Sequence, residues 1–238
     1  MTRPVIVGIN GSPRKYGQAS KLLMVAIEYA EREGAKTEII DLYDYEIKPC
    51  MACLSDNIKC CRFPCPLNDD FNIIAEKLIK ADGFIISTPI YWYAPSGIVK
   101  NFIDRLTSLE NMIYHEPGRS LLEGKVAGII AVGNDTGAIM AIAWLMVVLN
   151  SMGVHIPAWA LAYHHKEVDV LDNANAINDA ANLGANIARL AKIVMNEKAW
   201  YKPLAREEVS LIASRLRREM ELRESKDKET RLKIAGCK

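Results

Sequence analysis

Five of the six cysteines of this 238-residue chain crowd into one short stretch, CMACLSDNIKCCRFPC, and supply its most reactive side chains. They are Cys50, Cys53, Cys60, Cys61 and Cys65. Thiolates in C-x2-C spacing can reach one soft metal centre, and clustering of this kind in a reducing compartment indicates metal rather than disulfides. A cysteine followed by proline, as at the end of this stretch, also closes known iron–sulfur runs.

Three interpretations of the cysteine stretch remain open. A four-iron 4Fe-4S cluster, a zinc ion held by four thiolates, and no metal with free or paired thiols all fit the composition. The fifth cysteine is surplus in both metal interpretations. Asp69 and Asp70 follow the stretch and are expected to cap the next helix.

A second set of reactive groups lies near the start, in PVIVGINGSPRKYGQASKLL. A short apolar run there ends in Gly-Ser-Pro-Arg, and a helix-forming segment follows at once. Such a turn points backbone N–H groups and the positive end of a helix dipole at one spot, where a phosphate can bind. Ser12 and Ser20 add hydroxyl donors, and Arg14 adds a mobile charge.

The spacing of the glycines limits which kind of phosphate-containing ligand could bind. Five residues, not four, separate Gly11 from Gly17, and no lysine follows Gly17, so the pattern of a nucleotide-binding P-loop is absent. Two residues separate Gly8 from Gly11, so the dinucleotide fingerprint G-x-G-x-x-G is also absent. The alternative is an ordinary strand–helix turn that binds nothing.

Two further loops suit a planar ring. TPIYWYAPSG (Thr88–Gly97) places three aromatic residues in a row after a strand, and three neighbours cannot all face one core. At least one should line a crevice able to stack a heteroaromatic ring, although Trp92 and Tyr93 could instead pack at a surface or interface. VGNDTGA, with Asn134, offers backbone and side-chain donors near the same place.

Apolar runs alternate with helical stretches along the chain. Strands are predicted at Val5–Ile9, Thr37–Leu42, Gly83–Ser87, Val126–Val132 and Val154–Leu161. Helices are predicted at Ala19–Glu33, Phe71–Lys80, Gly97–Leu109, Ala138–Met152 and Asn173–Asn196. This alternation predicts an α/β fold, a doubly wound five-stranded parallel sheet covered on both faces. The loops Asn10–Ser20, Thr88–Gly97 and Gly133–Gly137 should therefore meet at the carboxyl ends of the strands.

The alternation gives a main domain over residues 1–200, which contains the cysteine-rich insertion 48–68, and a C-terminal helical extension over residues 201–238. The extension carries Val209, Ile212, Leu216 and Met220 at helical spacing among many charges. Together with the uncharged stretch Ala138–Leu149, it suggests a homodimer or homotetramer.

Composition limits the partners. The formal net charge of +1 gives no electrostatic argument for nucleic acid or an anionic membrane. The longest apolar run, Ala138–Leu149, falls short of the roughly 20 residues that span a bilayer. The first residues lack the apolar core of a secretory signal, so a cytoplasmic location is expected.

The segments GSPRKYGQAS, STPIYWYAPSG and VKNFIDR, within this alternation, resemble the flavodoxin-like NAD(P)H-dependent FMN reductase family, and its iron–sulfur flavoprotein branch above all. The resemblance covers about residues 4–195 and implies bound FMN. For the FMN phosphate it implies Ser12, Arg14, Gln18, Ala19 and Ser20. For the flavin ring it implies Pro89, Ile90, Tyr91, Trp92, Tyr93, Gly133 and Asn134.

The same resemblance implies which cysteines would bind a cluster. The branch holds a four-iron cluster through C-x2-C-x2-C-x4-7-C with paired aspartates soon afterwards, and Cys50, Cys53 and Cys65 match that frame. Asp56 stands where the family has its third cysteine. Cys60, with Cys61 as the alternative, would have to complete the set.

The implied activity is FMN-dependent electron transfer by an oxidoreductase, without a catalytic side chain, because flavin itself carries the chemistry. Electrons would pass from NAD(P)H or a carrier such as ferredoxin to a small acceptor such as a quinone or oxygen, through a cluster if one is present. One alternative is a cluster-free NAD(P)H:FMN or quinone reductase. Another is a non-enzymatic protein that senses redox state or metal.

Overall fold

The structure, a computed structural model, describes residues 3–197 and 199–236. Its centre is a parallel sheet in the order β2-β1-β3-β5-β6. These strands are β1 (Val5–Asn10), β2 (Lys36–Asp41), β3 (Gly83–Tyr91), β5 (Val126–Gly133) and β6 (Leu161–His165). The predicted doubly wound parallel sheet is thereby confirmed. From β1 the chain adds β2 on one side of the sheet and then β3, β5 and β6 on the other side. A crevice is expected where this order of addition switches, at the carboxyl ends of β1 and β3.

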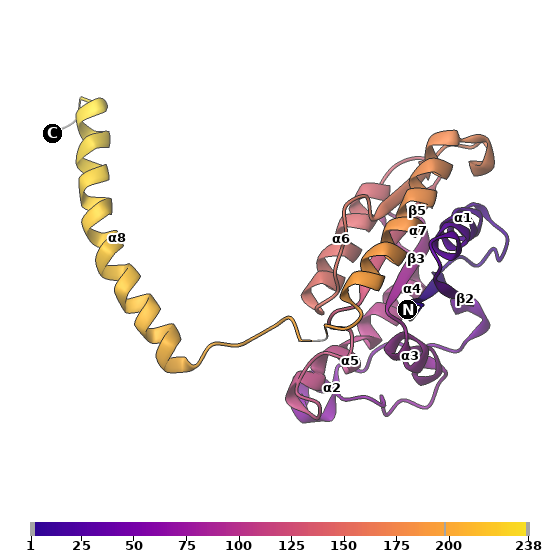
Figure 1. Cartoon of the computed structure of the whole chain (residues 1–238), viewed down its shortest axis with the longest axis horizontal. Helices are drawn as coiled ribbons and strands as arrows, with labels where there is room; N and C mark the ends of the chain where they lie inside the picture. The colour runs from indigo at the N-terminus through magenta and orange to yellow at the C-terminus, as the bar shows by residue number, and fades with distance from the viewer. Residues whose placement is uncertain (1–2, 198, 237–238) are drawn as a thin grey trace. The chain divides into compact units, whose positions relative to one another are not determined.

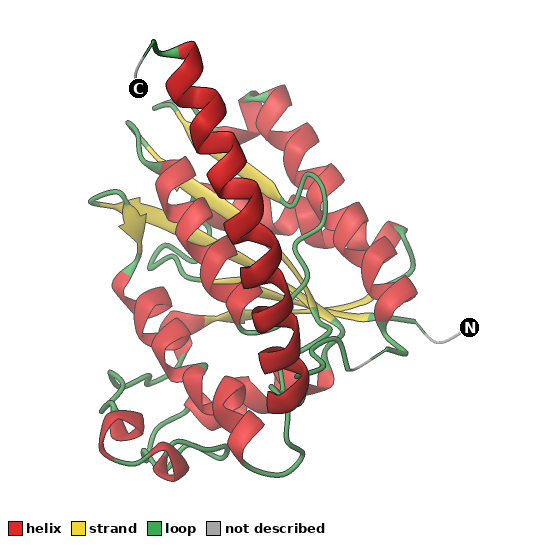
Figure 2. Ribbon diagram, turned by 90° about the vertical axis from the view of Figure 1, so that its left-hand side faces the viewer, coloured by secondary structure: helices red, strands yellow, loops and turns green. Residues whose placement is uncertain are grey.

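Helices cover both faces of the sheet (Figures 1 and 2). One face packs against α1 (Gln18–Arg32) and α7 (Ala174–Val194). The other face packs against α3 (Phe71–Lys80), α4 (Gly97–Arg105) and α6 (Ala138–Ser151). Since both faces are buried, β1, β3 and β5 are apolar along most of their lengths rather than alternating.

Short helical turns connect the main elements. They are α2 (Cys53–Asp56), α5 (Thr107–Glu110), η1 (Leu42–Asp44), η2 (Ile58–Cys60), η3 (Asn111–Tyr114) and η4 (Val170–Asp172). Residues 48–68, the cysteine segment, contain α2 and η2 and connect η1 to α3.

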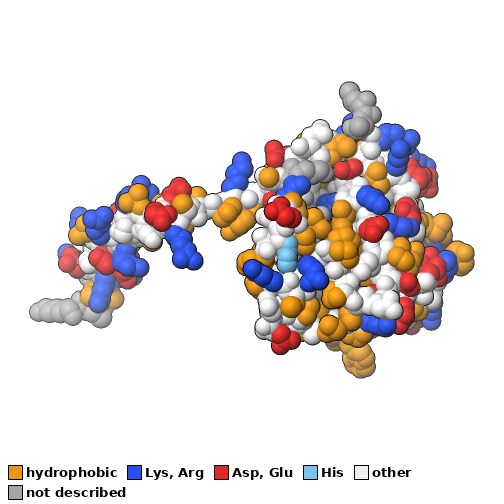
Figure 3. All heavy atoms as spheres, turned by 90° about the horizontal axis from the view of Figure 1, so that it is seen from below, with side chains coloured by type: hydrophobic (Ala, Val, Ile, Leu, Met, Phe, Trp, Pro, Cys, Tyr) orange, Lys and Arg blue, Asp and Glu red, His pale blue; other side chains and the backbone are white. Residues whose placement is uncertain are grey.

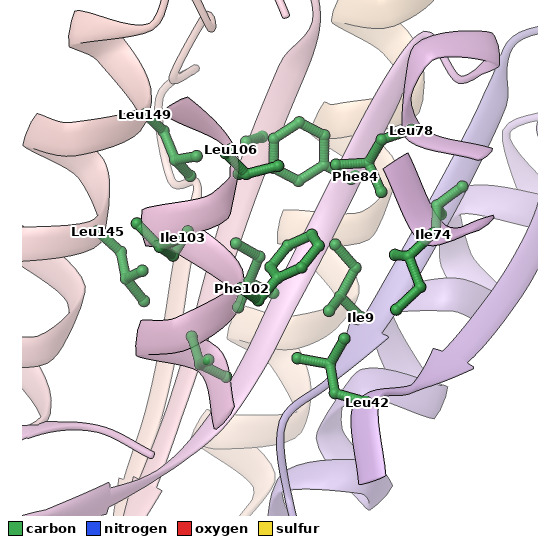
Figure 4. Packing of buried hydrophobic residues seen from close by; sticks show 14 of the residues in the cluster. Ile9, Leu42, Ile74, Leu78, Phe84, Phe102, Ile103, Leu106, Leu145 and Leu149 are labelled. Atoms are coloured by element: carbon green, nitrogen blue, oxygen red, sulfur yellow. The ribbon is translucent and has the colours of Figure 1, made fainter. Parts of the chain in front are cut away.

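The core between the sheet and α3, α4 and α6 is built around aromatic rings (Figure 4). In the view of Figure 4, Phe102 of α4 lies beside Ile9 of β1, with Ile74 of α3 beyond Ile9 and Leu145 of α6 on the opposite side. The Phe102 and Phe71 ring centroids are 6.1 Å apart. This packing fixes α4 firmly, which matters because both ends of α4 lie at candidate sites.

The last strand differs from its prediction. The chain was expected to be extended over Val154–Leu161, but β6 begins only at Leu161 and ends at His165. Before it, a single bridge joins His155 to Val126. Pro157 has no N–H to donate and Trp159 has a positive φ of 53°, so this part of the chain cannot continue a ladder.

A short strand was also missed. β4 (Ala94–Pro95) pairs antiparallel with the end of β3 and forms a hairpin. Its two residues are too few for a periodic signal, and a proline is tolerated there because the strand lies at an edge.

Residues 201–238 form a separate compact unit. It consists mainly of α8 (Arg206–Ile234), in which no residue is buried within the described chain. Cys237 lies outside the described residues. None of the helices that the structure describes combines the length and apolarity needed to cross a membrane. On the face drawn in Figure 3, acidic and basic side chains are interspersed.

Helices α1 and α7 approach so closely that a side chain between them cannot be accommodated. A Cβ added at Gly184 of α7 would lie 1.8 Å from the carbonyl oxygen of Ala26 in α1. We expect Gly184→Ala to lower the free energy of unfolding by about 2 kcal/mol or more, because the helices must separate. Urea denaturation followed by circular dichroism measures this. Gly97→Ala is the control, since a Cβ there meets nothing within 4 Å; an equal loss in both variants would contradict the explanation.

Candidate functional site

The carboxyl ends of the strands enclose a cavity of about 440 Å³. Three loops contribute to it: the first after β1, the second after β3 and the third after β5. The lining residues are Ser12, Arg14, Gly17, Gln18, Ala19, Pro89, Ile90, Tyr91, Trp92, Tyr93, Val132, Gly133, Asn134, Asp135 and Thr136. The topology thus brings together segments that are more than 100 residues apart in the chain.

Nearly every residue expected to hold FMN lines this cavity, and Ser20 is the exception. The Ser20 hydroxyl donates to the Arg14 carbonyl oxygen at 3.2 Å, so it stabilises the first loop without lining the cavity. Sequence reasoning did not single out Asp135 and Thr136 as site residues. Their position in the third loop, directly after Asn134, was the available signal.

The first loop is held by its own polar groups. The Ser12 hydroxyl oxygen accepts from the Arg14 N–H at 3.1 Å, and the Ser12 N–H donates to the Asn10 side chain at 3.1 Å. Helix α1 follows directly, with Gly17 at its N-cap and no side-chain cap in the described structure. The first N–H groups of α1 are therefore available to an anion in the cavity.

The Gln18 side chain forms hydrogen bonds outside the cavity that this residue lines. Its amide nitrogen donates to Asp169 at 3.3 Å, and its amide oxygen accepts from the Val170 N–H at 2.9 Å. Lys21 also pairs with Asp169 and, together with the Leu171 N–H, lowers the pKa of that carboxyl to about 2. The Gln18 side chain thus ties the first loop to the segment after β6, and Gln18 also lines the cavity.

Buried hydrogen bonds join the first and second loops. The Ser96 hydroxyl donates to the Gly11 carbonyl oxygen at 2.7 Å, and the Gly11 N–H donates to the Ser87 carbonyl oxygen at 2.7 Å. The Ser96 N–H in turn donates to the Thr88 hydroxyl oxygen at 3.0 Å. Because these groups are buried, breaking any one of them would leave an unsatisfied polar atom, and the two loops therefore hold one fixed separation.

The tip of the β3–β4 hairpin is strained. Trp92 and Tyr93 have consecutive positive φ values of 52° and 66°, a geometry that two-residue hairpin turns normally build from Asn-Gly. Tyr93 packs against Gly137, where a Cβ would lie 2.8 Å from the Tyr93 ring. Trp92 has no such packing and is 94% exposed. The strained backbone therefore presents an indole to solvent at the rim of the cavity.

A second, much smaller cavity is lined by thiols. Cys50, Cys53, Cys61 and Cys65 all contribute to it, whereas Cys60 is exposed and does not. Among the described residues, no group of three metal-ligating side chains is close enough to hold a single metal ion.

Cys61 takes its place in this cavity because of the segment beneath it. The Asn111 amide donates to the carbonyl oxygens of Ile58 and Cys61, at 2.8 and 2.7 Å. Cys61 is only 5% exposed, and burial, reinforced by the neighbouring Cys53, raises the pKa of its thiol to about 12. Of the two adjacent cysteines, the second is thus the inward one.

An ion pair clamps the two ends of the cysteine segment. Arg105, at the end of α4, donates to Asp69 at 2.5 and 3.1 Å and to the Lys48 carbonyl oxygen at 3.0 Å. The Lys48 N–H donates to Asp69 at 2.9 Å. Hydrogen bonds from Arg105 and from the backbone lower the pKa of Asp69 despite its burial.

The expectation that Asp69 and Asp70 both cap α3 is met only by Asp69. Asp69 does accept from the Phe71 N–H at 3.2 Å, but its carboxylate is fully buried against Arg105. Asp70, the N-cap residue, makes no side-chain cap and accepts instead from the Glu46 N–H at 2.8 Å. An arginine more than thirty residues away could not be paired with Asp69 from the sequence.

Comparison with known protein families identifies the family to which this fold belongs. The family model for NADPH-dependent FMN reductases matches residues 4–167. The chain belongs to this family. Membership supports FMN as the cofactor of the family's cavity at the carboxyl edge of the sheet.

Individual relatives point to one branch of the NADPH-dependent FMN reductase family. An iron-sulfur flavoprotein of Methanocaldococcus jannaschii is 35% identical over 128 residues, which are 54% of this chain and 61% of the relative. An iron-sulfur flavoprotein of Archaeoglobus fulgidus is 30% identical over 183 residues, 76% of this chain and 78% of the relative. Two of the curated relatives are matched over only 61% and 47% of their own lengths.

Solved structures agree on the fold. RosB, crystallised with bound 8-demethyl-8-formylriboflavin-5'-phosphate, superposes with a TM-score of 0.70. The comparison covers 91% of this chain and 87% of RosB at 20% identity. At that identity the likeness shows the shared fold, which agrees with the flavodoxin-like strand order.

The strained hairpin tip yields a stability prediction. We expect Trp92→Asn to raise the free energy of unfolding by about 0.5–1 kcal/mol, because asparagine tolerates the left-handed conformation and the indole makes little contact. Urea denaturation of the FMN-free protein measures the change. Tyr16→Asn is the control, since Tyr16 is 79% exposed but is not among the residues with positive φ. A loss of stability in Trp92→Asn would show that the indole packs more than its exposure indicates.

Proposed function

We propose that this chain is an FMN-dependent oxidoreductase that binds FMN in the three-loop cavity. One observation carries the proposal: a single cavity gathers an uncapped helix N-terminus, a serine- and arginine-bearing loop, and a run of aromatic residues. A phosphate and a flat, apolar ring in one ligand need that combination.

The residues divide according to the two ends of the ligand. Ser12, Arg14 and the backbone at Gln18–Ala19 would hold the phosphate, with Ser20 supporting the loop through its bond to Arg14. Pro89–Tyr93 and the third loop at Gly133–Asn134 would bind the ring. FMN itself supplies hydride acceptance and transfer of one or two electrons, and these residues bind it, orient it and limit access of water.

The family name supports NADPH or NADH as the electron donor. The exposed rim of the cavity, with Trp92 and Tyr91, suits a small acceptor such as a quinone or oxygen. A carrier protein such as ferredoxin remains the other candidate donor. The free thiols of residues 50–65 suit a reducing compartment such as the cytoplasm.

We also propose that the thiol cavity holds a 4Fe-4S cluster through Cys50, Cys53, Cys61 and Cys65. The donor set fits because four thiols line one cavity, and soft thiolates are the ligands that iron–sulfur clusters use. The separation of these thiols disfavours a single zinc ion. Cys61 takes the place for which Cys60 was the first choice, since Cys60 lies outside the cavity.

A cluster-free NAD(P)H:FMN or quinone reductase is the second candidate. Asp56 at the third position of the family's cysteine frame favours it. Iron and sulfide analysis separates the two candidates, and a protein that refused FMN altogether would instead support a redox- or metal-sensing role.

A homodimer or homotetramer is proposed from α6. This helix carries no charged residue and leaves Ile139, Met140 and Val147 exposed, so a second copy of the chain is its expected cover. Sedimentation of the FMN-loaded protein tests this, and a stable monomer would refute it.

FMN binding is tested by titrating the flavin-free protein and following flavin fluorescence. We expect saturable quenching with FMN and at least tenfold weaker binding of riboflavin, which lacks the phosphate. Arg14→Ala should weaken FMN binding at least about tenfold, since a hydrogen bond to a charged group contributes about 1.5–3 kcal/mol. Lys15→Ala is the matched control, because Lys15 pairs with Asp44 and does not line the cavity. Equal affinities for FMN and riboflavin would contradict the phosphate site.

The choice of cluster ligand is tested by paired serine variants reconstituted anaerobically with iron and sulfide. We expect Cys60→Ser to retain the iron and sulfide content of the unaltered protein, and Cys61→Ser to lose most of both. Thermal unfolding of the metal-free variants checks that each still folds. Loss of iron from Cys60→Ser with retention in Cys61→Ser would reverse the assignment.

A further inference from the structure

Arg105 is a buried cation that the clamp does not fully satisfy. Its side chain is 1% exposed and that of Asp69 is 0% exposed. Its two terminal nitrogens donate to Asp69 and Lys48, and its guanidinium lies over the Phe71 ring at 4.6 Å. Its Nε, however, has no hydrogen-bond partner among the described residues. Buried donors are almost always paired, so this N–H needs an acceptor that the protein's own oxygens do not provide.

Sulfur is the acceptor that lies nearby. Arg105 lines the same small cavity as Cys50, Cys53, Cys61 and Cys65. Burial alone would lower the pKa of Arg105, but its interactions with Asp69 and Cys65 outweigh burial and raise it. A neutral thiol accepts hydrogen bonds only weakly, whereas a thiolate or an inorganic sulfide carries negative charge and accepts them well. The environment of Arg105 is thus complete only with anionic sulfur in the cavity.

We propose that Arg105 is a positioning residue that sets the reduction potential of the cluster in this cavity, by donating its Nε–H to anionic sulfur at or next to Cys65. This inference rests on the proposed cluster. Arg105 forms no covalent bond and carries no electron. Its donated hydrogen bond and positive charge stabilise the more negative, one-electron-reduced state, and so raise the potential.

Asp69 has the opposite electrostatic effect. Its carboxylate neutralises Arg105 and places a negative charge behind the guanidinium, which disfavours an added electron in the cavity. Both residues also clamp the cysteine segment, through Lys48. A structural role predicts the same consequence when either residue is changed, whereas an electrostatic role predicts shifts of opposite sign.

The test is an anaerobic redox titration of the full-length, reconstituted protein, followed by electron paramagnetic resonance, with iron and sulfide measured in each sample. Arg105→Lys keeps the charge but removes the Nε donor, and should lower the midpoint potential by about the equivalent of tenfold, 59 mV for one electron. Asp69→Asn should raise it. Arg189→Lys, the same substitution in an exposed pair with Glu33, should leave it unchanged.

Each other outcome is decisive. Shifts in the same direction in both variants, or loss of iron and sulfide from both, would reduce Arg105 to a structural clamp and overturn the inference. An unchanged potential in iron-loaded Arg105→Lys would do the same. Absence of iron from the unaltered protein would refute the cluster proposal itself, which a flavin titration of the same sample leaves intact.

Discussion

The structure depends on one constraint, the burial of both faces of a parallel sheet. Such strands cannot be joined by tight turns, so each connection crosses over through a helix, and every strand delivers its following loop to the same edge. The Ser96–Gly11 and Gly11–Ser87 hydrogen bonds then lock the first two of these loops together. The cavity forms because the parallel strands place all three loops at the same edge of the sheet.

Helix α4 connects this cavity to the thiol cavity. It begins at Gly97, at the end of the second loop, and ends at Arg105, beside the cysteines. Its nine residues span about 13 Å at 1.5 Å per residue. Phe102 and Ile103 bury the middle of the helix in the core, so its two ends are held at a fixed separation. One rigid element therefore sets the distance between the two proposed redox sites.

Both sites contain residues in an unfavourable local state. Tyr93 adopts a left-handed conformation and its ring packs against Gly137, whereas Trp92 is also left-handed but has no such contact. Arg105 is buried with one donor unpaired, beside a cavity of thiols. Each departure lies beside a cavity where a ligand is expected, and backbone strain or an unpaired donor at such a place is a reason to look for one.

The sequence by itself determined the sheet, its flanking helices, the three loops and the clustering of thiols, because apolar periodicity and glycine-rich punctuation are local signals. Only the tertiary structure decided that Gln18 turns to Asp169, that Cys61 rather than Cys60 faces the thiol cavity, and that Asp69 pairs with Arg105. The physical reason is that each depends on a partner brought near by folding, and pairings across long stretches of chain leave no trace in local spacing.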